Sequence, residues 1–153
     1  METFKEFLIR KNAEASKEKL AYQKELDDYS KSVEKVFKKI KKWLLEYEGM
    51  GLLEIKFKEI KTNDDNIVQE LELIIANKII KFTPKGIKSE KIKIQSSLGS
   101  ATLKLENKKD WIVCVNGYSS FSPPKLTKIS FKNLIMEVFF GEDLQTYYYC
   151  TDL

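Results

Sequence analysis

The sequence contains no histidine, and this absence excludes several kinds of chemistry. Ser-His-Asp and Cys-His catalysis both require an imidazole base, and zinc sites with His ligands and pH switches near neutrality require the same side chain. The two cysteines, Cys114 and Cys150, lie far apart and lack the spacing of metal ligands. We therefore expect no bound metal or other cofactor and no enzymatic activity.

Glycine and arginine are also scarce. The chain has 6 glycines and neither a GxGxxG nor a GxxxxGK[ST] pattern, so no phosphate-binding loop can be recognised. Arg10 is the single arginine among 27 basic residues. Arginine makes the usual bidentate contacts to phosphate and guanine, so its scarcity argues against sequence-specific recognition of nucleic acid.

Long apolar runs are absent as well. No run approaches the roughly 20 residues that a membrane-spanning helix needs, and charges interrupt the first residues, so we expect no signal peptide. With two thiols and no export signal, the expected location is cytoplasmic. The 153 residues, 42% apolar and 33% charged, fit a single domain spanning 1–153.

Residues 1–48 are predicted to form one long helix. Thr3 and Glu6 have the spacing of a capping box, and no glycine or proline occurs before Gly49. Eight apolar residues then recur at alternating spacings of four and three: Tyr22, Leu26, Tyr29, Val33, Val36, Ile40, Trp43 and Tyr47. This heptad seam is typical of packing on a sheet or of a coiled coil between two chains. A helix over 4–47 would be roughly 65 Å long, so it either breaks near residues 15–19 or projects from the domain.

Residues 52–117 alternate between apolar and polar side chains in six short runs that are separated by turns. This pattern predicts an antiparallel meander of about six strands. The side chains expected to face the core include Leu53, Ile55, Phe57, Leu71, Leu73, Ile75, Trp111, Val113 and Val115.

Residues 127–140 are predicted to form a second helix packed on the sheet. Phe131, Leu134, Ile135, Val138 and Phe139 share one helical face, and Gly141 ends the pattern. Thr127 or Ser130 is the expected N-cap. Residues 142–153 form a tail that adds a last strand or packs across the sheet. The predicted fold class is therefore α+β.

This order of elements, with Pro84-Lys85-Gly86, Trp111 and Leu126-Thr127 at their positions, resembles small uncharacterised bacterial α+β proteins. The resemblance covers most of the chain. It implies the α+β fold and no activity.

The charge is unevenly distributed along the predicted sheet. Residues 77–109 hold nine lysines and two acidic residues, whereas residues 49–76 hold three lysines and six acidic residues. The candidate binding lysines are Lys78, Lys81, Lys91, Lys93 and Lys104. They predict either a solvated sheet face or a surface for an acidic protein, a nucleic acid or a membrane.

Three further groups of residues are weaker candidates. Lysines 35, 38, 39, 41 and 42 make the first helix basic and amphipathic, which suits core packing or a membrane surface. The pairs Asp64/Asp65 and Glu70/Glu72 could hold a cation or act as acid and base, although turns favour Asp in any case. Tyr118 and Phe121 are candidate contacts to a partner, as are Tyr22, Leu26 and Tyr29 on the first helix.

These features together predict a small non-enzymatic protein-binding module. Immunity, antitoxin, secretion-accessory and phage counter-defence proteins have such a size and class. The expected partner is another protein that is acidic or offers an apolar groove, and a homodimer through the N-terminal helix is a further alternative. The alternative function is binding of nucleic acid or a membrane surface through the lysine-rich sheet face.

Overall fold

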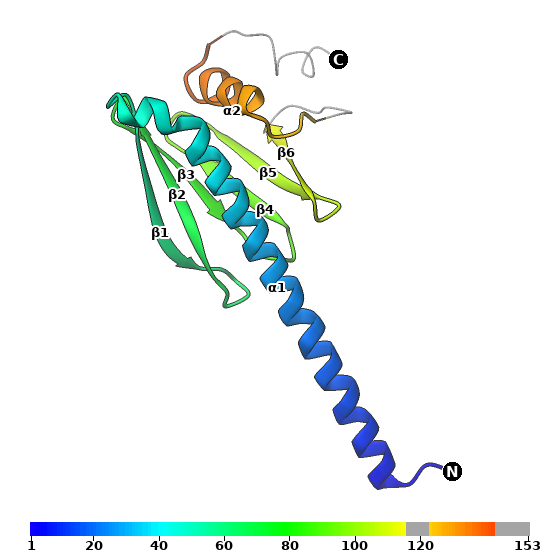
Figure 1. Cartoon of the computed structure of the whole chain (residues 1–153). Coiled ribbons are helices and arrows are strands. Elements are labelled where there is room, and N and C mark those ends of the chain that lie inside the picture. The colour runs from blue at the N-terminus through cyan, green and yellow to red at the C-terminus, as the bar shows by residue number, and fades with distance from the viewer. Residues whose placement is uncertain (116–122, 143–153) are drawn as a thin grey trace.

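The computed structural model describes residues 1–115 and 123–142 of the chain. The described elements are α1 (Phe4–Gly49), β1 (Glu54–Lys61), β2 (Ile67–Ile75), β3 (Lys78–Pro84), β4 (Lys91–Gln95), β5 (Ser100–Glu106), β6 (Asp110–Val115), α2 (Lys128–Leu134) and the π-helical turn η1 (Ile135–Phe139). The six strands form one antiparallel sheet in sequential order, and both helices lie on the same face of it (Figure 1). The predicted α+β meander with a long first helix is confirmed.

Helix α1 is continuous over 46 residues and is therefore about 69 Å long. Its start is the predicted capping box, in which the Thr3 hydroxyl accepts from the Glu6 backbone N–H and the Glu6 carboxylate accepts from that of Thr3. Its end is followed by Gly51, whose φ of 73° suits glycine because it has no Cβ. The helix does not break near residue 15. Its first half projects beyond the sheet, and residues 1–25 are all exposed (Figure 1).

The heptad seam of α1 packs on the sheet from Leu26 onward. Its members from Leu26 to Ile40 are buried together with Phe37, and Trp43 and Tyr47 are partly buried against the same core. The strand register places one inward-facing residue from every strand in a single row: Phe57, Leu71, Phe82, Ile94, Ala101 and Val115. All but Phe57 are buried. Because β1 is an edge strand, Phe57 is covered from one side only, by Phe37 at 6.4 Å between ring centroids.

The C-terminal helix differs from its prediction. The chain is helical over nearly all of the predicted range 127–140, but regular α-helix ends at Leu134 and the second half is a π-helical turn. A π-turn adds a residue per turn and rotates the following side chains. Ile135 and Phe139 are still buried as expected, but Glu137 is also buried at 3% exposure, which the apolar pattern did not indicate.

Phe131 joins the two helices to the sheet. It is fully buried, with its ring centroid 5.9 Å from that of Trp43 on α1 and 6.0 Å from that of Phe82 on β3. The N-cap of α2 is Thr127, whose hydroxyl accepts from the Ser130 backbone N–H. The centre of the sheet is thus covered by the second half of α1 and by α2, while the first half of α1 covers nothing.

Candidate functional site

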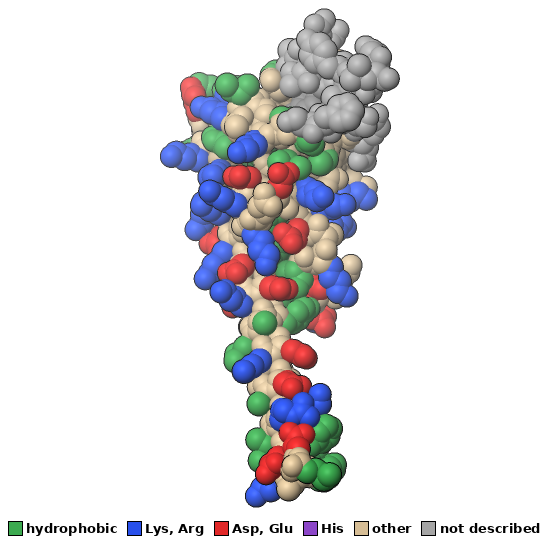
Figure 2. Space-filling model, turned by 90° about the vertical axis from the view of Figure 1, so that its right-hand side faces the viewer, with side chains coloured by type: hydrophobic (Ala, Val, Ile, Leu, Met, Phe, Trp, Pro, Cys, Tyr) green, Lys and Arg blue, Asp and Glu red, His purple; other side chains and the backbone are tan. Residues whose placement is uncertain are grey.

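The first candidate surface is the projecting part of α1, residues 4–25, which we call the helical arm. At its free end lie four exposed apolar residues, which we call the apolar tip: Phe4, Phe7, Leu8 and Ile9. Phe4 is 75% exposed, and its ring stacks on that of Phe7 at 6.2 Å. Figure 2 shows hydrophobic atoms gathered at this end of the molecule. The arm therefore holds an apolar patch about 33 Å from the point where α1 meets the sheet.

Exposed ion pairs follow the apolar tip along the arm. Arg10 contacts Glu2 at 2.9 Å and Glu14 at 3.3 Å, and Lys11 contacts Glu14 at 3.3 Å. The hydrogen bonds that Arg10 donates to the Glu2 carboxylate raise the pKa of Arg10, and the hydrogen bond that Glu14 accepts from Lys11 lowers the pKa of Glu14. Exposed pairs of this kind contribute little stability, so the arm depends on its continuity with the packed half of α1.

The three seam residues proposed as partner contacts fall in different environments. Tyr22 is exposed at the base of the arm, whereas Leu26 and Tyr29 are buried at 8% and 3% exposure. The Tyr29 hydroxyl donates to the Lys91 carbonyl at 3.0 Å and accepts from the Gly86 N–H at 3.3 Å. Burial raises the pKa of Tyr29, partly offset by backbone hydrogen bonds from Gly86 and Lys85. In the folded chain, Leu26 and Tyr29 thus hold α1 on the sheet and offer no surface to a partner.

The second candidate surface is on the sheet face opposite α1 and α2 (Figure 1). The strand alternation places Lys81, Lys91, Lys93 and Lys104 there, and we call these four residues the lysine face. Lys78 belongs to the opposite alternation and lies at the end of the β2–β3 hairpin. Lys81 is 3.9 Å from Glu72. Lys91 and Lys104 are direct cross-strand partners, and like charges in that position destabilise a sheet.

The acidic candidates make structural hydrogen bonds. Asp64 accepts from the Ile87 N–H at 2.8 Å, which joins the β1–β2 loop to the β3–β4 loop. Glu70 accepts from the Thr83 hydroxyl at 2.7 Å on the outer sheet face. Within residues 1–115 and 123–142, no group of three or more His, Cys, Asp or Glu side chains is placed to hold a metal ion. Tyr118 and Phe121 lie outside the described residues.

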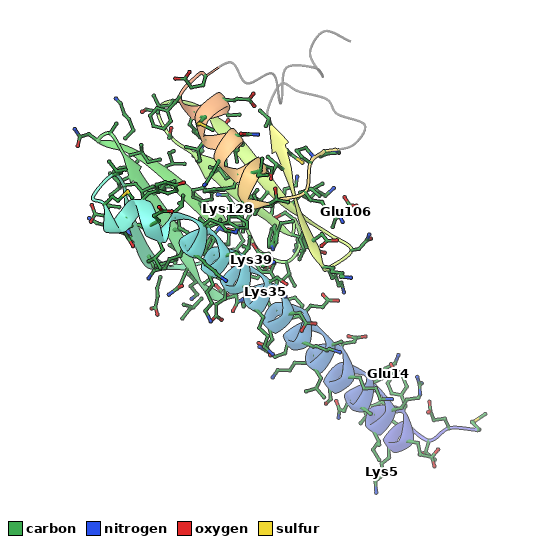
Figure 3. The ribbon with its side chains drawn as sticks, turned by 45° about the horizontal axis from the view of Figure 1, so that its top comes forward. Lys5, Glu14, Lys35, Lys39, Glu106 and Lys128 are labelled. Carbon is green, nitrogen blue, oxygen red and sulfur yellow. The ribbon has the colours of Figure 1, made fainter. Side chains whose placement is uncertain are left out.

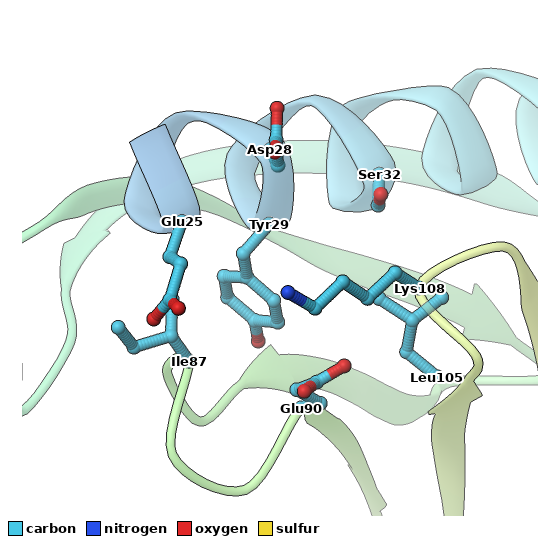
Figure 4. Close-up of a pocket in the computed structure, with 8 residues that line it drawn as sticks. All are labelled: Glu25, Asp28, Tyr29, Ser32, Ile87, Glu90, Leu105 and Lys108. Carbon is cyan, nitrogen blue, oxygen red and sulfur yellow. The ribbon is translucent and has the colours of Figure 1, made fainter. Parts of the chain in front are cut away.

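A small pocket lies between α1 and the β3–β4 loop (Figure 4). Its walls include Tyr29 and Leu105, and the carboxylates of Glu25, Asp28 and Glu90 surround it with Lys108. Its volume is about 90 Å³, well below the range of ordinary ligand pockets.

A larger groove lies on the other side of Lys108, and the sequence analysis did not find it. It brings Lys35 and Lys39 of α1 together with Lys108 and Lys109 of the β5–β6 turn and with Lys125. Lys35 and Lys39 belong to the lysine cluster of the first helix, whereas Lys108 and Lys109 belong to the lysine-rich residues 77–109. No local sequence pattern connects these two groups. The nearest signal was the high density of lysine in both segments.

Comparison with protein-family models, with curated proteins and with solved structures finds no match to this chain. No helix within the described part of the chain combines the length and the apolar character needed to cross a membrane.

Proposed function

We propose that the chain is a non-enzymatic protein-binding module that acts in the cytoplasm and contacts another protein through the helical arm. The observation that carries this proposal is the apolar tip. Four large apolar side chains stand exposed on the helical arm, the part of α1 that contributes no residue to the core cluster. Burial of each such side chain by a partner is worth about 1.5–3 kcal/mol.

The geometry of the arm favours a partner that offers an apolar groove. Phe4, Phe7 and Leu8 have the i, i+3, i+4 spacing by which a helix places side chains into a groove. Because α1 is held on the sheet from Leu26 onward, the tip is presented in a helical conformation before binding. A partner then does not have to supply the free energy of ordering the arm.

Affinity capture tests the proposal with three forms of the full-length chain. The tip variant carries Phe4→Ser and Leu8→Ser, and the control carries Lys17→Ser on the same arm. We expect the wild type and the control to retain the same protein from cells that naturally make the chain, and the tip variant to lose it. A captured set that is identical for all three forms would contradict the proposal.

The same variants distinguish a homodimer from a different partner. If the arm binds a second copy, light scattering of the wild type reports twice the monomer mass of 17.9 kDa, and the tip variant reports the monomer. The seam from Leu26 onward is occupied by the sheet, so the contact between copies would lie within the arm.

The lysine face supports the alternative function, which is binding of an anionic polymer or a membrane surface. The specific observation is the directly opposed pair Lys91 and Lys104, which an anion would stabilise. Binding to single-stranded oligonucleotide or to vesicles of anionic lipid is the test. The logarithm of the association constant for the oligonucleotide should fall linearly with the logarithm of salt concentration, and Lys91→Gln should reduce the slope of that line.

A further inference from the structure

The basic groove is formed by three segments that are distant in the sequence. Helix α1 contributes Ser32, Lys35, Val36, Lys39 and Trp43; the β5–β6 turn and the start of β6 contribute Lys108, Lys109, Asp110 and Trp111; and the segment before α2 contributes Lys125, Leu126 and Thr127. Its volume is about 290 Å³, about three times that of the small pocket between α1 and the β3–β4 loop. Figure 3 labels Lys35 and Lys39, which line the groove from α1, and Lys128, which starts α2 directly after the lining residue Thr127.

The floor of the groove is apolar and rigidly held. Val36 and Trp111 are buried, and the ring of Trp43 packs against the ring of Phe131 with 5.9 Å between their centroids. The segment at the far wall is tied to the edge of β6 by two backbone hydrogen bonds: Leu126 N–H donates to the Trp111 carbonyl and Val113 N–H donates to the Pro124 carbonyl, both at 2.8 Å. The groove is therefore formed before any ligand arrives.

The rim of the groove is strongly positive. Five lysines and one carboxylate line it, and that carboxylate, Asp110, lies 3.7 Å from Lys125. Lys35, Lys39, Lys108 and Lys109 make no ion pair with any residue in the described part of the chain. The ammonium group of Lys108 points into the neighbouring pocket, which Glu25, Asp28 and Glu90 also line (Figure 4). The ammonium groups of Lys35, Lys39 and Lys109 remain for the groove, and around its apolar floor they favour an anionic ligand with an apolar part.

We infer that this groove binds an acidic peptide segment of the partner protein, with carboxylates at the lysine rim and an apolar side chain over Val36, Trp43 and Leu126. The inference rests on the proposed protein-binding function and adds a second contact to it. The lysine ammonium groups attract carboxylates as point charges, and no arginine lines the groove. A single nucleic acid strand binds by stacking successive bases on several exposed rings, but of the two rings here Trp111 is only 8% exposed and Trp43 is partly buried.

Intrinsic fluorescence gives a direct readout, because both tryptophans of the chain line the groove. The probe is a synthetic peptide of glutamates around a central leucine, titrated into the full-length chain. The comparison ligands are the same peptide with glutamine in place of glutamate and a single-stranded oligonucleotide of equal charge. We expect the acidic peptide to shift the tryptophan emission with saturation and the glutamine peptide to bind at least tenfold more weakly.

Charge reversal locates the site. Lys35→Glu with Lys39→Glu should weaken binding of the acidic peptide by tenfold or more, since the charge at the rim changes by four units. The matched control is Lys31→Glu with Lys38→Glu, two exposed lysines of the same helix that do not line the groove, and it should change affinity less than threefold. Lys109→Glu with Lys125→Glu changes two other segments of the groove, so weaker peptide binding by that variant as well excludes a defect of α1 as the cause. Thermal unfolding confirms that each variant is folded.

Several results would overturn the inference. One is equal weakening by the groove pair and the control pair, which would show general attraction to a positive protein. Another is that the oligonucleotide binds more tightly than the peptide and that Lys35→Glu with Lys39→Glu abolishes this oligonucleotide binding. A third is saturable peptide binding that leaves the tryptophan emission unchanged. The Phe4→Ser and Leu8→Ser tip variant should bind the peptide normally, so failure of the arm proposal is distinguishable from failure of this one.

Discussion

The Tyr29 hydroxyl should stabilise the fold by accepting a hydrogen bond from one buried backbone amide, that of Gly86. Its two partners are the Lys91 carbonyl and the Gly86 N–H. In a Tyr29→Phe variant the Lys91 carbonyl still accepts from the Lys85 N–H at 2.9 Å, so the acceptor remains satisfied. The Gly86 N–H, on a buried residue, loses the acceptor at 3.3 Å.

An unsatisfied buried donor costs about 1–3 kcal/mol, which sets the expected loss in the free energy of unfolding. For a chain of this length, each kcal/mol lowers the melting temperature by about 2–4 °C. Chemical denaturation gives the free energy, and hydrogen exchange gives the local effect, because the Gly86 amide should lose protection while amides at the centre of the sheet keep theirs.

The pH dependence supplies a second, independent test. Burial raises the pKa of Tyr29 above the value of about 10 that it has in the unfolded chain. Above pH 10 the unfolded state therefore releases this proton before the folded state does, and the stability of the wild type declines. Tyr29→Phe lacks this group, so the stability difference between the two proteins should narrow as the pH rises beyond 10.

Three results together refute the reasoning. The free energy of unfolding of Tyr29→Phe lies within about 0.5 kcal/mol of the wild-type value, the Gly86 amide keeps its protection from hydrogen exchange, and the stability difference between the two proteins does not vary above pH 10. These results would mean that the hydroxyl neither satisfies the amide nor titrates with folding.

Two further predictions concern the core and the lysine face. Phe131→Ala should lower the free energy of unfolding by about 3–5 kcal/mol, because it opens a cavity between both helices and the sheet. Ile129→Ala on the same helix, 74% exposed, should change it by less than about 0.5 kcal/mol in the same denaturation assay. Lys104→Glu should raise the free energy of unfolding by about 0.2–1 kcal/mol, since it replaces repulsion across the strands by attraction to Lys91. The gain should shrink in high salt, and a gain that is independent of salt would exclude this cause.

Much of the fold was predictable because its signals are local. The capping box at Thr3 and the absence of helix breakers before Gly49 define α1 within a few residues. Alternation over the strands predicted both the meander and the inward face, since successive side chains of a strand point to opposite sides. The second half of the C-terminal helix was not predictable in this way, because the π-turn at Ile135 keeps the apolar residues buried while changing the hydrogen-bond pattern.

The candidate surfaces were predictable only in part. Lysine density indicated a basic sheet, and the alternation placed Lys91 and Lys93 on one side of it. The heptad seam did not reveal which of its residues would remain exposed. Leu26 and Tyr29 look equivalent to Tyr22 in the pattern, yet they are buried because the sheet begins to cover α1 at that point.

The sequence by itself determined the order of the elements, the two ends of α1 and the two faces of each strand, because these depend on hydrogen bonds and side-chain spacing within a few residues. Only the tertiary structure decided where the arm leaves the sheet and which charges meet. Lys35 and Lys109 line one groove although more than seventy residues separate them, because the packing of α1 beside the β5–β6 turn brings them together. Contacts of that range depend on how whole elements pack, and no local pattern encodes them.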